Sequence, residues 1–464
     1  MIRRLRNLPA AICFLTIVVV AAAAPPPNVL ILLADDQRFD TIHALGNSAI
    51  RTPHLDRLVK EGFAFTHAHI MGGRQGAICM PSRAMLMTGR TLYRAALPAA
   101  QGRPADHVIR TPAVLMPEVF RSAGYRTFAV GKWHNDKPSF NRAFTAGDAI
   151  FFGGMHDHEQ VPVHSYDPTG AYPNNRRQTN RVFSSTLFAN AAIQFLERHP
   201  VEQPFFLYVA FTAPHDPRTP PPEFAAMYRP EKIKLPPNFL PEHPFDNGEL
   251  KVRDEKLLPW PRTPKAVQQE IAAYYGMISH LDAEIGRILN TLEARGLRRQ
   301  TLVVFGGDNG LAVGQHGLLG KQNLYDHSVR VPLVFSGPGV PSNRRSAALC
   351  YLHDVFPTLC ELSGLPVPPV VEGRSLVGIM QGREDKVYTT LYAAYREHQR
   401  MVRDERYKLL VYPQANRVQL FDLRKDPWET RDLSGEANFA DVMEQLKKSL
   451  QEWQQTVEDP LFKP

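Results

Sequence analysis

The chain is predicted to adopt an α/β fold built around a large, mostly parallel β-sheet. Its 464 residues are 44% hydrophobic and 22% charged, an ordinary globular balance with enough length for a large core. Apolar runs of strand length recur at residues 29–33, 127–130, 205–209, 302–305 and 332–335. Such near-continuous runs are typical of strands covered on both faces, and helical patterns lie between them, so the sequence favours an α/β sandwich.

Three segments between these strands have helical spacing, at residues 53–61, 112–123 and 266–295. In the last, apolar side chains repeat with this spacing at Ile271, Tyr275, Ile278, Leu281, Ile285, Ile288 and Leu292. Gly296 follows where a glycine commonly ends a helix. Strand alternating with helix is the pattern expected for a parallel sheet.

The composition changes after about Gly373. Residues 387–395, 406–412 and 418–423 are predicted to form short strands, and a closing helix carries on one face Phe439, Val442, Leu446, Leu450 and Trp453. We therefore expect a small antiparallel sheet with a helix over residues 376–464, after a main domain over residues 25–375. The proline-dense stretch 213–264 is too long for a simple connector and is expected to cap a binding site.

Residues 1–24 have the pattern of a secretory signal peptide. Arg3, Arg4 and Arg6 precede an apolar segment, and small residues at 21–24 suit cleavage. The apolar run of about fifteen residues is shorter than the roughly twenty that span a bilayer. We therefore expect a periplasmic or secreted protein with no stable membrane span after cleavage, and the alternative is a retained N-terminal anchor.

The net charge and the cysteines narrow the class of protein further. A formal net charge of +8 suits a polyanionic substrate, but no dense Lys/Arg run marks a nucleic-acid surface. Of the four cysteines, Cys13 lies in the signal segment. Cys350 and Cys360 either form one disulfide or remain buried thiols.

Charged groups follow four of the predicted strands at their carboxyl ends, where open α/β sheets bind ligands. These groups are Asp35-Asp36, Lys132-Trp133-His134, His215-Asp216 and Asp308-Asn309. Each pair alone also suits a turn, a helix cap or a surface loop. Together, the Asp and Asn oxygens predict a site for a hard divalent cation, Ca²⁺ or Mg²⁺. Arg83, Lys132 and Lys321 add positive charge, and His134 and His215 can transfer protons, so the set suits transfer of an anionic group.

Residues 79–90 read C-M-P-S-R-A-M-L-M-T-G-R. Pro81 suits the first turn of a helix, so a helix over residues 82–88 would place Cys79 beside free backbone N–H groups that attract anions. The alternative is a buried structural cysteine.

This stretch resembles the sulfatase signature at every defined position, and residues 28–339 resemble a sulfatase of the alkaline phosphatase superfamily. The resemblance implies an α/β/α sandwich with residues 25–375 as the catalytic domain, and Ca²⁺ as the metal. It implies that Cys79 is oxidised by a maturation enzyme to formylglycine, whose hydrate attacks a sulfate ester. The implied metal ligands are Asp35, Asp36, residue 79, Asp308 and Asn309.

The resemblance also implies the remaining roles. Arg83 supports the hydrate, Lys132 and Lys321 contact the sulfate, and His316 is a further candidate for this contact. His215 faces the leaving oxygen, and His134 accepts a proton during sulfate release. His156, His158 and Arg218 are candidate pocket residues for a sulfated glycan.

Two departures from the family pattern occur, and two other functions stay open. Gly307 stands where Ser or Thr is common, and Asn135-Asp136 stand where Leu-Gly often follows G-K-W-H. The rival enzyme is a phosphodiesterase or phosphonate monoester hydrolase of the same superfamily. A glycan-binding module without catalysis is the non-enzymatic alternative.

Overall fold

The computed structural model describes residues 25–100 and 102–463. The predicted signal peptide, residues 1–24, lies outside the described residues. Within the described part, no helix combines the length and apolar character needed to cross a membrane.

The predicted central sheet is confirmed. Its strand order is β11-β2-β10-β9-β1-β8-β4-β5, with β12 also paired to β2. The strands are β1 (Asn28–Ala34), β2 (Gly62–His69), β4 (Arg126–Lys132), β5 (Ala146–Phe151), β8 (Phe205–Ala210), β9 (Thr301–Gly307), β10 (Arg330–Ser336), β11 (Arg344–Ser346) and β12 (Cys350–Tyr351). Neighbours from β9 to β5 are parallel, whereas β10 runs antiparallel to β2 and β9. All five predicted apolar runs form strands of this sheet.

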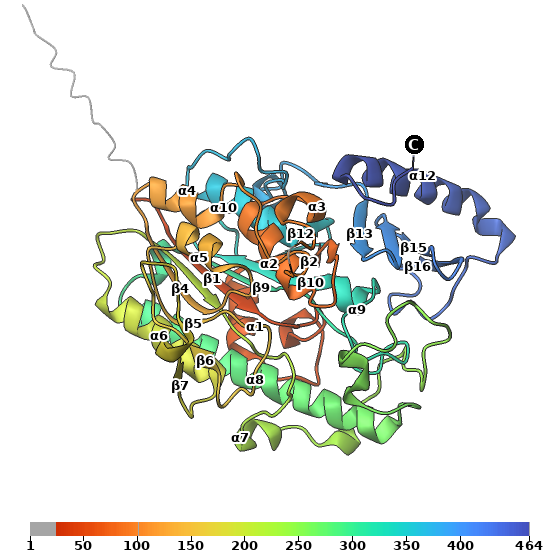
Figure 1. Cartoon of the computed structure of the whole chain (residues 1–464), viewed down its shortest axis with the longest axis horizontal. Coiled ribbons are helices and arrows are strands. Elements are labelled where there is room, and N and C mark those ends of the chain that lie inside the picture. Colours follow the sequence, from red (N-terminus) through yellow and green to blue (C-terminus); the bar gives the residue numbers. More distant parts are fainter. Residues whose placement is uncertain (1–24, 101, 464) are drawn as a thin grey trace, which may run out of the picture.

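Helices cover both faces of the sheet, as Figure 1 shows with α8 on one side and α4 and α10 on the other. Alternate residues of β1 separate the two cores. Val29, Ile31 and Leu33 join the core that contains α2, α4 and α10. Leu30, Leu32 and Ala34 join the core built with α1, α6 and α8. The α/β/α sandwich therefore follows from burial of both faces of each strand.

The described helices, apart from short 3₁₀ turns, are α1 (Pro53–Glu61), α2 (Cys79–Thr88), α3 (Leu92–Ala95), α4 (Met116–Ser122), α5 (Lys137–Ala143), α6 (Ser184–Arg198), α7 (Pro222–Ala225), α8 (Pro264–Ala294), α9 (Asp326–Val329), α10 (Val355–Leu362), α11 (Val377–Met380) and α12 (Ala440–Val457). The helix predicted over 112–123 begins only at Met116, because the Glu118 carboxylate accepts a hydrogen bond from the Leu115 N–H at 2.7 Å and caps it there. Gly296 has φ of 69° just beyond α8, as a C-terminal glycine should.

The second sheet has the order β16-β15-β14-β13-β3 and packs with α12 beside the main sheet (Figure 1). Its strands are β3 (Gly72–Gly73), β13 (Leu391–Tyr395), β14 (Gln399–Arg403), β15 (Tyr407–Tyr412) and β16 (Arg417–Asp422). A minor ribbon pairs β6 (Pro162–Val163) with β7 (Gln178–Thr179). The domain boundary at residue 376 stays a prediction, since β3 pairs with β13 across it.

The sequence prediction missed β14, because Arg400 and Arg403 interrupt its apolar pattern. Both are buried nonetheless, since Arg400 forms a bidentate pair with Asp459 at 2.6 and 2.8 Å. Arg403 lies 3.4 Å from Asp326. Ion pairs therefore allow a charged segment to form an interior strand.

Cys350 and Cys360 are buried free thiols. Of the two alternatives that the sequence leaves open for this pair, the structure has two buried thiols that are not joined to each other.

A buried charge cluster ties the small sheet to the large one. Lys408 of β15 places its Nζ 2.8 Å from Asp326 Oδ1 and 2.7 Å from Glu429 Oε1. Asp326 begins α9, which leads directly into β10. The side chains of all three residues are at most 5% exposed, so the charges depend on one another for compensation.

We expect Lys408→Ala to destabilise the protein by about 3–5 kcal/mol, because it leaves the buried Glu429 carboxylate without its cation and removes one of the cations beside Asp326. Urea denaturation followed by circular dichroism measures the loss. Lys386→Ala is the matched control, since its 2.8 Å pair with Glu405 is solvent-exposed and should be worth only about 0–1 kcal/mol. Equal losses in the two variants would contradict the role of the cluster.

Candidate active site

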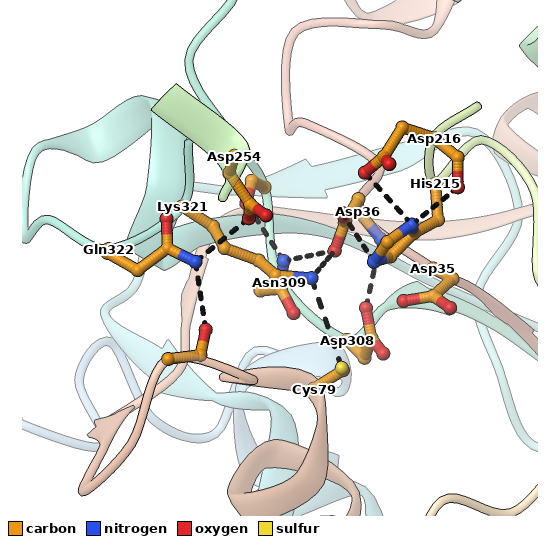
Figure 2. A network of polar contacts seen from close by, with 12 residues as sticks. Asp35, Asp36, Cys79, His215, Asp216, Asp254, Asp308, Asn309, Lys321 and Gln322 are labelled. Carbon is orange, nitrogen blue, oxygen red and sulfur yellow. Dashed lines mark hydrogen bonds and ion pairs between the residues drawn. The ribbon is translucent and has the colours of Figure 1, made fainter. Parts of the chain in front are cut away.

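Four neighbouring parallel strands, in the order β9-β1-β8-β4, bring the predicted polar groups to one edge of the large sheet. Asp35 and Asp36 follow β1, and Asp308 follows β9. Lys132 ends β4, and His215 lies beyond β8. Figure 2 shows the carboxylates, His215, Lys321 and Cys79 facing one another.

Cys79 enters this group from α2. The helix begins at Cys79, three residues earlier than predicted, because the Ser82 N–H donates to the Ile78 carbonyl oxygen at 3.2 Å. The Cys79 Sγ lies 3.1 Å from His134 Nδ1, 3.6 Å from Lys132 Nζ and 3.9 Å from Lys321 Nζ. The thiol is therefore surrounded by one imidazole and two ammonium groups.

The buried carboxylates are paired with these cations. Lys132 contacts Asp35, and Lys321 Nζ lies 2.6 Å from Asp36 Oδ1. Arg83 Nε donates to Asp308 Oδ2 at 2.9 Å, and its Nη1 donates to the Lys132 carbonyl oxygen at 2.7 Å. Arg83 thus joins α2, β4 and the end of β9.

The oxygen atoms fit a divalent cation. One ligand atom from each of Asp35, Cys79 and Asp308 lies within 4.8 Å of the others, and the same holds for Asp35, Asp36 and His215. Among the described residues, the buried Asp35 Oδ1 and Asn309 Oδ1 have no hydrogen-bond partner. Unpartnered buried oxygens beside two more carboxylates suit a hard cation such as Ca²⁺ or Mg²⁺.

Burial and neighbouring charges shift the pKa values of these groups. Burial raises the pKa of the Cys79 thiol to about 11 despite the nearby lysines, so an unmodified thiol is a poor nucleophile. Burial and the Asp35 charge raise the pKa of Asp308 to about 6. Burial, followed by the Lys132 charge, holds the pKa of His134 well below its usual value, so this ring is neutral beside Cys79.

His215 is oriented by its neighbours. Its Nδ1 lies 2.9 Å from the Asp216 carbonyl oxygen, which leaves Nε2 3.6 Å from Asp36 Oδ2. His158 places its Nε2 2.9 Å from the His215 carbonyl oxygen and its Nδ1 2.7 Å from Ser184 Oγ. His158 therefore positions His215 from behind.

Two site residues have left-handed backbones, Asp36 with φ of 67° and His134 with φ of 71°. Such conformations cost about 1–3 kcal/mol for residues other than glycine and persist only where surrounding contacts hold them. Gly154 packs against His134, since a Cβ atom there would lie 2.7 Å from the imidazole Nε2. A side chain at position 154 would therefore force the His134 ring to shift.

A cavity of about 240 Å³ opens above Cys79. Besides the predicted Cys79, His134, His215 and Lys321, it is lined by Arg253, Asp254 and Gln322, which sequence reasoning missed. Arg253 Nη2 lies 2.9 Å from Asp216 Oδ1 and 2.7 Å from Asp254 Oδ1, and Gln322 Nε2 donates to Asp254 Oδ2 at 2.8 Å. Two features of the sequence could have pointed to these residues. Arg253 and Asp254 lie in the proline-dense segment that was expected to cap a binding site, and Gln322 directly follows Lys321.

None of the four predicted substrate contacts lines this cavity. His316 stacks on Tyr325 with ring centroids 3.9 Å apart, and its Nε2 lies 3.1 Å from Asn238 Nδ2. Arg218 pairs with Glu270 at 2.7 Å. His158 is buried behind His215, and His156 is exposed beside Met155, which lines the mouth.

The two departures from the sulfatase pattern have local explanations. A Cβ atom at Gly307 would lie 2.7 Å from the Gln37 carbonyl oxygen, so a larger residue has no room. The Asp136 carboxylate accepts a hydrogen bond from the Ser139 N–H at 2.9 Å and caps α5. Asn135 Nδ2 donates to the Asp106 carbonyl oxygen at 3.0 Å. Both departures affect packing and leave the charged groups in place.

The protein-family model described as "Sulfatase" matches residues 27–365, well over half of the chain. The chain belongs to the sulfatase family. A second model, described as "N-sulphoglucosamine sulphohydrolase, C-terminal", matches residues 314–456 of this sulfatase. The protein is therefore a sulfuric ester hydrolase of the alkaline phosphatase superfamily.

Individual relatives and solved structures match more than nine-tenths of its length. An N-acetylglucosamine-6-O-sulfatase of Bacteroides thetaiotaomicron is 24% identical over 497 residues, covering 92% of this chain and 86% of that protein. A solved complex of a protein with its substrate D-glucosamine-2-N,6-O-disulfate has a TM-score of 0.78 at 22% identity, covering 94% of this chain and 99% of that one. The phosphonate monoester hydrolase of Agrobacterium radiobacter has a TM-score of 0.74 at 21% identity, covering 93% and 96%. These two structures share the fold.

We expect Ca²⁺ to raise the melting temperature of this sulfatase, because a ligand that binds only the folded state stabilises it by about 2.7 kcal/mol at a hundred times its Kd. Differential scanning calorimetry in EDTA and in millimolar Ca²⁺ measures the shift. Asp35→Asn should abolish it, whereas Asp157→Asn, at an exposed position, should retain it. An unchanged shift in Asp35→Asn would place the cation elsewhere.

Proposed function

We propose that this sulfatase releases sulfate from a sulfated carbohydrate, with formylglycine made from Cys79 as the nucleophile and a divalent cation, Ca²⁺ or Mg²⁺, as cofactor. The observation that carries this proposal is the meeting of Cys79 Sγ with His134, Lys132 and Lys321 within 3.9 Å, next to the cluster of carboxylates. Sγ marks the place of the oxygen atoms of the modified residue. The cation and the hydrated aldehyde together supply a nucleophile of lowered pKa and a charge that polarises the sulfate ester.

The side chains around position 79 supply charge and protons. Lys132 and Lys321 place positive charge where the sulfuryl oxygens gain negative charge in the transition state. His134, neutral and 3.1 Å from Sγ, can accept a proton from residue 79 when sulfate departs. The Nε2 of His215 is the nitrogen free to protonate the departing alcohol, because Nδ1 is held by the Asp216 carbonyl. Arg83 positions Asp308 and the Lys132 backbone.

The cavity supports a substrate of one terminal sugar unit. A volume of about 240 Å³ lies below the ~300–1,000 Å³ typical of pockets for drug-sized ligands. Arg253, Asp254 and Gln322 offer charged and amide groups at the mouth for hydroxyl or anionic groups of the sugar. The relative named for N-acetylglucosamine 6-sulfate and the neighbour bound to a disulfated glucosamine support a carbohydrate substrate. The exposed His156 would contact longer substrates. His158 and Arg218 would not touch the substrate, since His158 holds His215 and Arg218 pairs with Glu270.

We also propose, from residues 1–24, that the chain is exported to the periplasm or beyond, and that a formylglycine-generating enzyme acts on Cys79. The main domain over residues 25–375 then carries the whole cluster of catalytic groups, and residues 376–464 pack beside it.

Cys79→Ala should reduce sulfate release by at least about 10³-fold, because it removes the nucleophile. The assay is ion chromatography of sulfate released from sulfated mono- and oligosaccharides and an aryl sulfate, with the aldehyde at residue 79 first verified by peptide mass. Expression without the maturation enzyme should have the same effect as Cys79→Ala. Near-normal turnover in either preparation would contradict the mechanism.

The same panel includes an aryl phosphonate monoester and an aryl phosphate diester, because the Agrobacterium hydrolase shares the fold. Higher kcat/KM on these esters than on every sulfate ester would make the rival function the principal one. Tight glycan binding without sulfate release, despite a verified aldehyde, would instead indicate a binding protein.

His215→Ala should lower kcat by about 10²–10⁴-fold for a sugar sulfate, because its alkoxide leaving group needs a proton. The loss should be much smaller for p-nitrophenyl sulfate, whose leaving group departs as a stable anion. Stopped assays on both substrates measure the ratio, with His43→Ala at an exposed position as control. Equal losses on both substrates would exclude His215 as the general acid.

A further inference from the structure

A second cavity, of about 510 Å³, shares no lining residue with the Cys79 cavity. It lies between the loop after β1, the start of β10 and residues 232–237 of the proline-dense segment. The proposed sulfatase mechanism uses none of its side chains.

Positive charge dominates its lining. Arg38, Lys232, Lys234 and Arg330 are the cations, and Asp40 is the single acidic residue of the lining. Arg38 pairs with Asp40 through two contacts of 2.8 and 2.9 Å, and Arg330 lies 3.6 Å from Asp326, so the two lysines carry the unpaired charge. Within residues 25–100 and 102–463, neither of the exposed Lys232 and Lys234 has a carboxylate within ion-pair distance. Free ammonium groups at the rim of a cavity attract an anion.

Two buried donors border the same cavity without an acceptor. Gln315, fully buried, accepts from the Val313 N–H at 2.5 Å through Oε1, and its Nε2 has no partner in the described part of the chain. Arg38, 3% exposed, likewise leaves Nη1 without an acceptor there. Buried N–H groups are normally satisfied, so an oxygen-rich ligand or water is expected beside them.

Aromatic and apolar surface completes the lining. Trp428 is half-buried, and the Arg330 guanidinium stacks on Phe39 at 3.9 Å, which fixes this charge in place. A flat ring beside hydroxyl and amide groups offers one apolar and one polar surface, as a sugar ring requires.

We propose that this cavity is an accessory binding site for an anionic saccharide, separate from the catalytic pocket. Lys232 and Lys234 bind its sulfate or carboxylate groups, and Trp428 packs against a sugar ring. The choice of a saccharide as ligand rests on the proposed function, whereas the preference for an anion rests on the lining charges alone.

The position of the cavity suits a second contact with the same polymer. Arg38 follows Asp36 by two residues, and Tyr275 of the lining adjoins Tyr274, whose hydroxyl donates to the Asp36 carbonyl oxygen at 2.6 Å. The second cavity therefore borders the loop that carries the active-site residues Asp35 and Asp36. A glycan held in the accessory site stays close to the enzyme between successive releases of sulfate, which raises the effective concentration of its chain ends.

The test is isothermal titration calorimetry with a heparin-derived hexasaccharide as probe, on full-length Cys79→Ala protein so that the probe is not consumed. Lys232→Ala/Lys234→Ala and, separately, Trp428→Ala should each weaken binding by about 3- to 30-fold. The control is Lys256→Ala/Lys265→Ala, which removes two exposed lysines of the same segment and its neighbouring helix without touching this cavity. The lysine variants change only exposed side chains, so we expect these variants to fold like the parent protein.

Retention of the control's affinity by either variant overturns the accessory site, as does equally tight binding of the neutral maltohexaose. In the active enzyme, the lysine variant should raise KM for a polymeric substrate and leave KM for an aryl sulfate unchanged. Failure of all sulfate release would overturn the proposed function while leaving the calorimetric result standing.

Discussion

The pairing of three buried carboxylates with three buried cations at one sheet edge is the constraint on which the rest of the structure depends. Asp35, Asp36 and Asp308 are at most 2% exposed, as are Arg83, Lys132 and Lys321. Burying any one of these ions alone would cost several kcal/mol, so the set is stable only when strands β1, β4 and β9 end at the same level and α2 brings Arg83 between them. The parallel register of the sheet supplies this alignment.

The same constraint shapes the backbone around the site. Asp36 and His134 occupy left-handed conformations that direct their side chains toward the charge cluster. Gly154 leaves room for the His134 ring, and His158 holds the carbonyl of His215 from behind. These supports turn flexible strand-end residues into fixed groups, which catalysis by preorganised charge requires.

Residues outside the charge cluster line the cavities beside it. The proline-dense segment places Arg253 and Asp254 at the mouth of the catalytic pocket and Lys232 and Lys234 at the rim of the second cavity. Trp428, from the chain that follows the small sheet, completes that second cavity. In the proposed function, surface loops therefore select the substrate, while the sheet edge holds the groups proposed to act on the sulfate ester.

The sequence by itself determined the fold class, the strand ends and the family. Apolar runs and helical spacing are patterns within a few consecutive residues, so they can be recognised without a structure. Motif spacing likewise marked Asp35, Asp36, Cys79, Lys132, His134, His215, Asp308, Asn309 and Lys321, which the fold brings to one edge, while their catalytic roles remain predictions.

Only the tertiary structure decided which other polar residues share that site. Arg253 and Gln322 line the pocket, whereas His316, close to Lys321 in sequence, stacks on Tyr325 outside it. Strand β14 could not be predicted from the sequence, because Asp459 and Asp326, which neutralise its arginines, come from distant segments. For the two arginines of β14 the physical reason is that the burial of a charge depends on a partner more than fifty residues away, and local pattern carries no information about that partner.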